Sequence, residues 1–335
     1  MESQVQVSII CLTYNHEKYI RECLEGFVSQ KTDFAFEVLV HDDASTDATA
    51  SVIREFEAKY PHIIKPTYQT ENQYSKGKNI IMPLLMSKAR GKYFAWCEGD
   101  DFWTDPYKLQ KQYDALSAHP ECFMCVAKTK VVNEDGSPRG NFLPNRPVPV
   151  GAIPSDEFLK ITETYCFHTS TYFVVGDLYR SYIADPPSYR TVARVGDEAM
   201  ILYFGSLGSV FFLDETVSCY RIGGASSWTV QFRSKLQNAI QHCDNMIAMN
   251  ECFNEHTKHR FHDACVLRIT RQRFLRDRLC GNFRALIAKE YAHIFRQLPA
   301  KDKWEIRIGV LFPRLLPWAR RKLSALKNRL KGSAK

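Results

Sequence analysis

Apolar runs and amphipathic stretches alternate along the first hundred residues of the chain. Short apolar runs between polar residues predict buried strands, and apolar residues that recur every three or four positions predict helices. The predicted strands are 5–12, 36–40, 63–68 and 93–97. The predicted helices are about 20–27, 46–60 and 78–90. This alternation predicts an α/β fold with a mainly parallel, Rossmann-like sheet flanked by helices.

Helix ends and later segments are less regular. Ser45 or Thr46 is the expected N-cap of the second helix. Five prolines between Pro138 and Pro154 predict a long loop, and strand-like segments follow at 172–175 and 210–213. From about residue 231 the strand signals end and helical spacing dominates, so we expect a helical C-terminal extension over 231–335.

The charge of the chain is placed unevenly. The formal net charge is +8, yet the eleven Lys and Arg residues after position 300 face only Asp302 and Glu305. Apolar and basic residues are mixed over 304–330, interrupted by Pro313 and Pro317. Such a basic amphipathic tail, with a helix expected over 318–331, predicts contact with an anionic membrane surface. The alternative is a tail that packs on the protein with its charges solvated.

Other sequence features narrow the class of protein. No apolar run reaches the length of a membrane span and the N-terminus does not resemble a secretory signal, so we expect a cytoplasmic protein. A peripheral position on the inner face of the cell membrane is compatible with this expectation. No motif indicates nucleic-acid binding. The eleven cysteines are scattered and odd in number, which favours reduced, buried thiols. Cys122 and Cys125 have the spacing of zinc ligands or of a redox pair, but no second pair stands at a matching distance, so we expect a core strand there.

Acidic clusters follow two predicted strands, at 41–43 and 98–101. Ligands of open α/β sheets bind beyond the carboxyl ends of the strands, so both clusters should face one crevice. In an extended segment Glu98 and Asp100 project to the same side and Asp101 projects elsewhere. Carboxylates in this arrangement suit Mg²⁺ or Mn²⁺. A solvated acidic turn before the helix near Pro106 is the alternative reading.

Four segments together resemble, in order and spacing, the family 2 glycosyltransferases of the GT-A fold. They are 7–15 (VSIICLTYN), 40–47 (VHDDASTD), 91–101 (GKYFAWCEGDD) and 102–112 (FWTDPYKLQKQ). The resemblance is strong over about the first 130 residues and thins towards residue 230. It implies a nucleotide-sugar-binding half over 1–130 and an acceptor-binding half over 131–230.

The resemblance assigns the nucleotide contacts to four residues. Thr13 and Asn15 match residues that contact the nucleoside diphosphate. Asp43 matches the aspartate that binds the base or ribose, and Lys78 lies where the family often has a basic residue near the nucleotide.

The resemblance assigns the metal ion to the second acidic cluster, residues 98–101. Asp100 matches the acid of the family's DxD motif that binds a divalent cation, Mn²⁺ or Mg²⁺. Glu98 replaces the first aspartate and is given a binding role only. Asp101, and Arg221 in a Tyr-Arg pair, are also counted among the nucleotide-sugar-binding residues. For Arg221 an ordinary salt bridge is an equal alternative.

Asp197 is the candidate catalytic base. It precedes an apolar helical stretch, at the place where the family has its catalytic aspartate, and Gly196 stands where a glutamate is usual. The alternative reading is a helix N-cap, and Glu198 is a neighbouring candidate. His168 and Trp103 are expected to be structural.

The expected function is therefore an inverting, metal-dependent, hexosyltransferase-like glycosyltransferase. It would move a sugar from a nucleotide sugar, with a UDP-sugar as the expected donor, to a hydroxyl of a glycan or lipid-linked saccharide in cell-surface polysaccharide biosynthesis. A nucleotidyltransferase is a weaker alternative because 12–17 lacks a glycine-rich phosphate loop. A non-catalytic glycan- or membrane-binding protein on the same fold is a third possibility.

Overall fold

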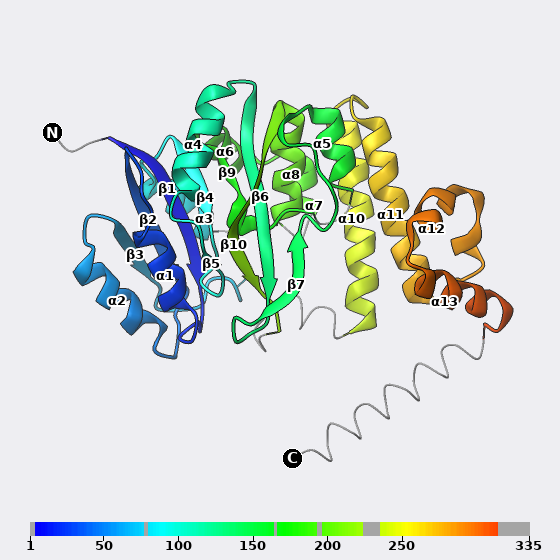
Figure 1. Ribbon diagram of the computed structural model, residues 1–335, viewed down its shortest axis with the longest axis horizontal. Coiled ribbons are helices and arrows are strands. Elements are labelled where there is room, and N and C mark those ends of the chain that lie inside the picture. The colour runs from blue at the N-terminus through cyan, green and yellow to red at the C-terminus, as the bar shows by residue number, and fades with distance from the viewer. Residues whose placement is uncertain (1–3, 77–79, 164–165, 193–195, 224–234, 314–335) are drawn as a thin grey trace, which may run out of the picture. The chain divides into compact units, whose positions relative to one another are not determined.

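The computed structural model describes residues 4–76, 80–163, 166–192, 196–223 and 235–313. The chain divides into two compact units, Met1–Ser227 and Trp228–Lys335. Within the described residues every strand lies in the first unit, and the second unit is built from helices (Figure 1).

Ten strands of the described residues form one sheet, in the order β3-β2-β1-β4-β9-β6-β10-β5, with β7 beside β6 and β8 beside β10. The first group is parallel and comprises β1 (Val5–Thr13), β2 (Ala35–Asp42), β3 (Ile64–Tyr68) and β4 (Tyr93–Trp96). The long strands β6 (Cys122–Val132) and β10 (Ser209–Arg221) are also parallel to each other. The antiparallel strands are β5 (Phe102–Trp103), β7 (Pro138–Leu143), β8 (Gly151–Ile153) and β9 (Phe173–Val175).

Helices cover both faces of this sheet. The first-unit helices are α1 (Ile20–Val28), α2 (Thr49–Lys59), α3 (Ile81–Lys88), α4 (Lys108–Ala118), α5 (Ser155–Ile161), η1 (Thr169–Thr171), α6 (Gly176–Ala184), α7 (Ser188–Val192) and α8 (Gly196–Leu207). Alternate residues of a strand point to opposite faces. Ala95 and Cys97 accordingly join the core under α1, α2 and α4, while Phe94 and Trp96 pack against Tyr179 of α6.

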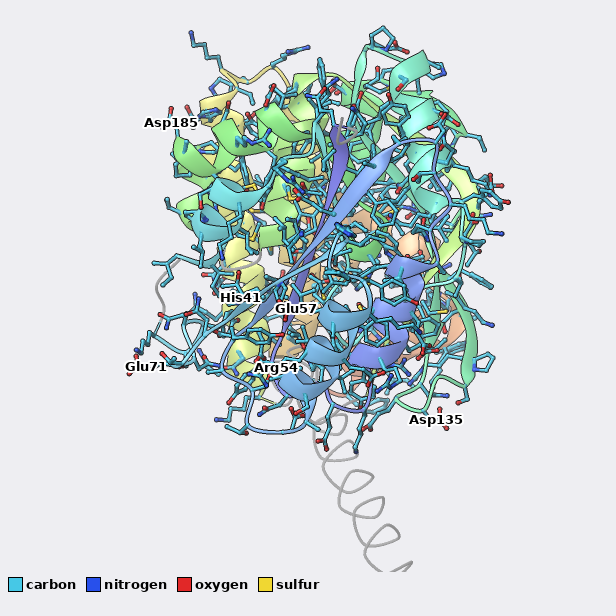
Figure 2. The ribbon with its side chains drawn as sticks, turned by 90° about the vertical axis from the view of Figure 1, so that its left-hand side faces the viewer. His41, Arg54, Glu57, Glu71, Asp135 and Asp185 are labelled. Carbon is cyan, nitrogen blue, oxygen red and sulfur yellow. The ribbon has the colours of Figure 1, made fainter. Side chains whose placement is uncertain are left out.

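Side chains of α2 also secure the end of β3. The Tyr68 hydroxyl donates to Glu57 Oε2 at 3.2 Å, and the Arg54 guanidinium lies 4.7 Å from the centre of the Tyr68 ring (Figure 2). This fixes the outer strand of the parallel group.

The second unit contains α10 (Leu236–His256), α11 (His262–Cys280), η2 (Ala285–Ile287), η3 (Lys289–Tyr291), α12 (Ala292–Gln297) and α13 (Ala300–Leu311). Its small core gathers Phe274, Phe283, Leu286, Tyr291, Ile294 and Ile306. The helix expected at 318–331 lies outside the described residues. Among the described residues, no helix has both the length and the apolarity that crossing a bilayer requires.

Two local predictions were wrong. The N-cap of α2 is Ala48, and the side chain that accepts the Thr49 N–H is that of Asp47, at 3.0 Å, because Ser45 is turned towards Asn15. The proline-rich stretch 138–154 is also not one loop, since it contains β7 and β8. β7 pairs with the preceding strand β6 and β8 pairs with the distant strand β10, and the proline content of the stretch reveals neither pairing.

The cysteines follow the expected pattern. All eleven are free thiols, and nine are fully buried. Cys122 and Cys125 lie in β6, so their spacing reflects a core strand.

Candidate functional site

The register of the parallel strands brings both acidic clusters to one edge of the sheet. Thr13 at the end of β1 is paired with Asp42 at the end of β2. β4 ends beside Ile10, so the segment that follows it runs past the last residues of β1. There the Gly99 N–H donates to the Leu12 carbonyl at 2.9 Å.

Asn15 connects the first two strand ends. It has a left-handed backbone with φ of 55°, a conformation that asparagine tolerates better than most residues. Its N–H donates to Ser45 Oγ at 2.9 Å, and its Oδ1 accepts the Thr46 N–H at 2.8 Å. These bonds hold the turn after β1 against the loop after β2.

Asp43 lies buried at the same edge and organises the segment after β3. Its N–H donates to the Thr13 carbonyl at 3.0 Å. Its carboxylate accepts the N–H groups of Gln73 at 2.8 Å and Tyr74 at 3.0 Å. The neighbouring His41, also buried, has its Nε2 3.1 Å from Gln69 Nε2 (Figure 2). Lys78 lies outside the described residues.

The second acidic cluster, residues 98–101, forms a loop after β4, which we call the acidic loop. Gly99 allows this loop to approach the turn after β1. A Cβ at this position would lie 2.6 Å from Thr13 Oγ1 and 3.0 Å from His16 Nδ1. Both of these atoms are buried and have no hydrogen-bond partner in the structure. Buried polar atoms are normally paired, so Thr13 Oγ1 and His16 Nδ1 mark a place where a ligand group or water would complete the bonding.

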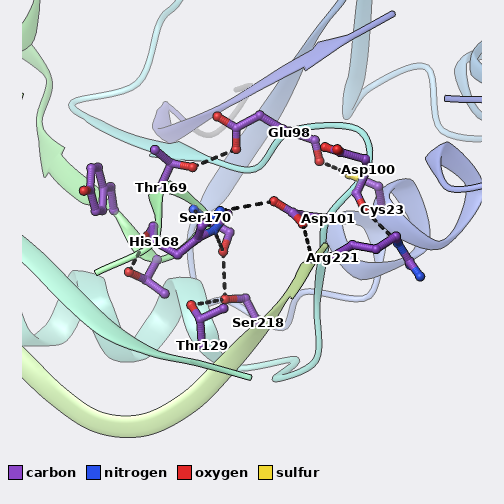
Figure 3. A network of polar contacts seen from close by, with 12 residues as sticks. Cys23, Glu98, Asp100, Asp101, Thr129, His168, Thr169, Ser170, Ser218 and Arg221 are labelled. Atoms are coloured by element: carbon purple, nitrogen blue, oxygen red, sulfur yellow. Dashed lines mark hydrogen bonds and ion pairs between the residues drawn. The ribbon is translucent and has the colours of Figure 1, made fainter. Parts of the chain in front are cut away.

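Glu98 is held by a contact from a distant part of the chain. The Thr169 hydroxyl of η1 donates to Glu98 Oε2 at 2.8 Å (Figure 3). Burial raises the pKa of Glu98, and the Thr169 bond opposes this effect. The Glu98 side chain is therefore fixed in position beneath the acidic loop.

Asp100 presents the least engaged carboxylate of the cluster. Its side chain is partly exposed, and within the described ranges no group donates a hydrogen bond to it. The described residues contain no group of three or more His, Cys, Asp or Glu side chains able to hold a metal ion. Mg²⁺ commonly takes only one or two protein carboxylates and completes its shell with phosphates and water, so a single oxygen ligand at Asp100 fits such an ion.

Asp101 points into the protein, as the alternation along the segment predicts. Its Oδ1 accepts the Arg221 N–H at 2.7 Å, and its Oδ2 lies 3.5 Å from His168 Nε2. Burial lowers the pKa of His168 to about 3. Burial, followed by the charges of Asp100 and Glu98, raises that of Asp101.

A chain of hydroxyl groups continues this contact inward. His168 Nδ1 lies 2.8 Å from Ser170 Oγ, which is 2.9 Å from Ser218 Oγ, and Ser218 Oγ is 2.9 Å from Thr129 Oγ1 (Figure 3). Ser170 also accepts the Trp103 Nε1–H at its carbonyl, at 2.9 Å. His168 and Trp103 are thus structural, as expected, and the network connects the acidic loop to β6, η1 and β10.

Arg221 ends β10 and is almost fully buried against the acidic loop. Its Nε donates to the Asp100 carbonyl at 2.9 Å, its Nη1 to the Glu134 carbonyl at 3.0 Å and its Nη2 to Glu22 Oε2 at 2.6 Å. The guanidinium also lies 4.9 Å from the Tyr19 ring centre. These contacts correspond to the salt-bridge alternative for Arg221, and they hold the backbone on which Asp100 is carried.

Asp197 lies in the first turn of α8, and its Oδ1 accepts the Glu198 N–H at 2.8 Å. Burial, followed by the charge of Glu198 and a smaller contribution from Glu98, raises the pKa of Asp197 to about 7. Burial, then Asp197, Glu198, Cys166 and Glu98, likewise raises the pKa of Tyr172. Asp197 and Glu98 therefore belong to one electrostatic cluster although 99 positions separate them in the sequence.

Several residues of this site were not found from the sequence. Thr169, Ser218, Glu22 and Glu134 act through contacts with residues at least 48 positions away. Single Ser, Thr or Glu residues in ordinary strands and helices carry no local signal for such contacts.

The parallel strands, the acidic loop at their carboxyl edge and the mixed second half of the sheet define a GT-A-type transferase fold. Residues 8–175 match the family described as glycosyl transferase family 2. The chain belongs to that family.

Three curated relatives each match less than half of the chain. An uncharacterised protein of Mycobacterium tuberculosis, Rv1520, is 43% identical over 157 residues, which are 46% of this chain and 44% of that protein. The putative glycosyltransferase EpsE of Bacillus subtilis is 32% identical over 149 residues, 44% of this chain and 52% of EpsE. The putative teichuronic acid biosynthesis glycosyltransferase TuaG, also of B. subtilis, is 28% identical over 137 residues, 41% of this chain and 52% of TuaG. The chain thus spans about half the length of these relatives.

Solved structures share the fold along most of the chain. Staphylococcus aureus TarS 1–349 in complex with UDP has a TM-score of 0.53 at 17% identity and covers 95% of this chain and 88% of its own. The mannosyltransferase PcManGT of Pyrobaculum calidifontis, in complex with GDP-Man and Mn²⁺, has a TM-score of 0.52 at 16% identity. The match covers 93% of this chain and 89% of the PcManGT chain. At these identities the likeness concerns the fold.

Proposed function

We propose that this chain is a metal-dependent, inverting glycosyltransferase that uses a nucleotide sugar, with UDP as the leaving group. The observation that carries the proposal is the acidic pair Glu98 and Asp100 after β4, whose member Glu98 also raises the pKa of Asp197 at the start of α8. Glu98 and Asp100 suit the binding of a cation together with a diphosphate, and Asp197 suits the role of a proton acceptor.

The donor would bind along the carboxyl edge of β1, β2 and β4. Thr13 Oγ1 is buried without a partner, and Asn15 and Asp43 stand at the ends of the neighbouring strands. We assign these three residues to the nucleoside diphosphate, with Lys78 as a further candidate. TarS has been solved with UDP, which supports testing UDP first.

Asp100 would hold a divalent cation, Mn²⁺ or Mg²⁺, and Glu98 would support it. A cation at this place supplies neutralisation of the charge that develops on the departing diphosphate. PcManGT has been solved in complex with GDP-Man and Mn²⁺, which makes Mn²⁺ the first ion to test. We assign Asp101 and Arg221 as positioning residues, because their polar groups are engaged with the protein.

Asp197 would act as the base. The acceptor hydroxyl oxygen forms a bond to the anomeric carbon, the bond from that carbon to the diphosphate oxygen breaks, and the hydroxyl proton passes to the Asp197 carboxylate. A pKa near 7 suits a general base at neutral pH. Attack opposite to the leaving group inverts the anomeric configuration.

The acceptor we propose is a hydroxyl of a glycan or a lipid-linked saccharide in cell-surface polysaccharide synthesis, at the cytoplasmic face of the membrane. The name of TuaG, a teichuronic acid biosynthesis glycosyltransferase, supports this setting. A lipid-linked acceptor lies in the membrane, whose anionic surface the basic C-terminal tail would contact.

Two measurements test the proposal. Calorimetry with UDP in the presence and absence of Mn²⁺ should show binding that Mn²⁺ strengthens. A hydrolysis screen of nucleotide sugars with Mn²⁺ should then identify one donor that is slowly cleaved. Metal-dependent UDP binding without cleavage or transfer of any donor would favour a non-catalytic binding protein, and no UDP binding would exclude the proposed function.

A further inference from the structure

α13 in the second unit has two apolar faces, and only one of them is packed. Ile306 is fully buried in the small helical core, and Val310 packs against that core. A Cβ on Gly309 would lie 2.3 Å from the Phe283 ring, so the helix contacts this core closely. The orientation of α13 within its unit is therefore fixed by this packing.

The opposite face carries four large apolar side chains in solvent. They are Trp304 (63% exposed), Ile308 (42%), Leu311 (71%) and Phe312 (55%), which we call the α13 stripe. Positions i, i+4 and i+7 lie on one side of a helix, so Trp304, Ile308 and Leu311 form one continuous surface, and Phe312 follows directly at the C-cap of α13. Scattered exposed apolar residues are ordinary, whereas such a contiguous surface indicates an interaction site.

Charges around the stripe are mainly positive. The two acids of α13, Asp302 and Glu305, share one guanidinium, since both accept hydrogen bonds from Arg278 Nη2, at 2.8 and 2.7 Å. Lys301 and Arg307 are exposed, and helical spacing puts them at the borders of the stripe. After Glu305 the sequence contains no acidic residue and nine basic ones.

We propose that the α13 stripe docks the protein on an anionic lipid bilayer, with α13 lying in the plane of the headgroups. This inference rests on the proposed function in one respect, because the membrane is where a lipid-linked acceptor would be found. An apolar helix face with tryptophan, bordered by cations and followed by a basic segment, has the composition of a helix that binds at the membrane interface. A second copy of the chain is the less suitable occupant, because two equally basic surfaces repel each other.

The experiment compares the full chain with matched double variants by flotation with vesicles of phosphatidylcholine, alone or with phosphatidylglycerol. The stripe variant is Trp304→Gln with Leu311→Gln. The control variant is Val266→Gln with Ile287→Gln, two exposed apolar residues of the same unit outside the stripe. Circular dichroism checks that both variants are folded, and UDP calorimetry checks the donor site independently.

We expect the unmodified chain and the control to bind the anionic vesicles, and the stripe variant to bind them at least about tenfold more weakly. Raising the salt concentration should weaken the binding, since surface charges are screened. Lipids brominated in their acyl chains should quench tryptophan fluorescence, and Trp304→Phe should lose part of this quenching while keeping the binding.

Equal vesicle binding by the stripe and control variants would overturn the inference. Equal binding to neutral and anionic vesicles would overturn the part played by charge. A stripe that instead mediates self-association would be revealed by sedimentation, if the unmodified chain is a dimer without lipid and the stripe variant is a monomer. The two proposals can fail separately. An unmodified chain that binds UDP but no vesicles would contradict this inference alone, and one that binds vesicles but no UDP would contradict the proposed function alone.

Discussion

The Thr169 hydroxyl donates a 2.8 Å hydrogen bond to Glu98, although 71 positions separate the two residues. Thr169 lies in η1, directly before β9, and β9 pairs with β4, the strand that leads to Glu98. The bond thereby connects the two halves of the sheet at the acidic loop. It also determines which way the Glu98 carboxylate points.

Replacing Thr169 by valine tests this connection. The change keeps the shape of the side chain and removes the donor, so we expect a loss of stability of about 1–2 kcal/mol and weaker UDP binding in Mn²⁺. Urea unfolding and calorimetry measure the two effects. Thr162→Val is the matched control, since its buried hydroxyl donates to the Phe158 carbonyl of α5. If both variants bind UDP equally well, Thr169 has no part in donor binding.

Asp100→Asn should lower the affinity for UDP in Mn²⁺ by about tenfold or more, because the change removes an anionic oxygen from the proposed cation site. Affinity in the absence of metal should change little. Calorimetry with and without Mn²⁺ measures both values. Asp105→Asn, which alters the Lys111 pair outside the acidic loop, is a control for general loss of charge. Unchanged Mn²⁺-dependent affinity in Asp100→Asn would remove this residue from the metal site.

Asp197→Asn should reduce transfer by about 100-fold or more while leaving UDP binding nearly intact, since a general base acts on the transition state. Single-turnover transfer and UDP calorimetry measure the two quantities. Glu198→Gln is the comparison, because this residue follows Asp197 in the same turn. If Glu198→Gln loses transfer and Asp197→Asn retains it, the base is Glu198.

The raised pKa of Asp197 also predicts a pH dependence of stability. Asp197 has a folded-state pKa of about 7 against 3.8 as its ordinary value, so between these values the folded state holds the proton more tightly. Stability therefore falls as pH rises from about 4 to 7, and this loss remains above pH 7. Asp197→Asn should raise the melting temperature at pH 8 by about 2–4 °C and have less effect at pH 5. Thermal unfolding at both pH values checks this, and an equal change at both would show that Asp197 is not the titrating group.

Arg221→Lys should destabilise the protein by about 1.5–3 kcal/mol, because lysine cannot reproduce three hydrogen bonds made by a planar guanidinium. UDP affinity in Mn²⁺ should fall as Asp100 loses its backbone support. Arg21→Lys at the exposed pair with Glu55 is the matched control and should cost little. A variant of normal stability whose UDP binding is weakened even without metal would point to direct contact between Arg221 and the diphosphate.

Local patterns predicted the parallel part of the fold well. β1, β2, β4 and α1 were found within one or two residues at each end, since buried strands and amphipathic helices are encoded by neighbouring residues. β8 was missed because its strand conformation depends on pairing with β10, far away in the sequence, and β7, a hairpin partner of the preceding β6, was missed because its stretch is rich in proline. The GT-A fold itself followed from ordered motifs over the first 130 residues.

For the site, the sequence by itself determined which residue types stand at the strand ends: Thr13, Asp43, Glu98 and Asp100 follow their strands directly, and the carboxyl ends of parallel strands meet at one edge. Only the tertiary structure decided how each is used. Asp101 and Arg221 turned out to be engaged with each other, and Asp197 to share the field of Glu98. Burial and electrostatic interactions depend on distance in space, and sequence spacing does not encode that distance.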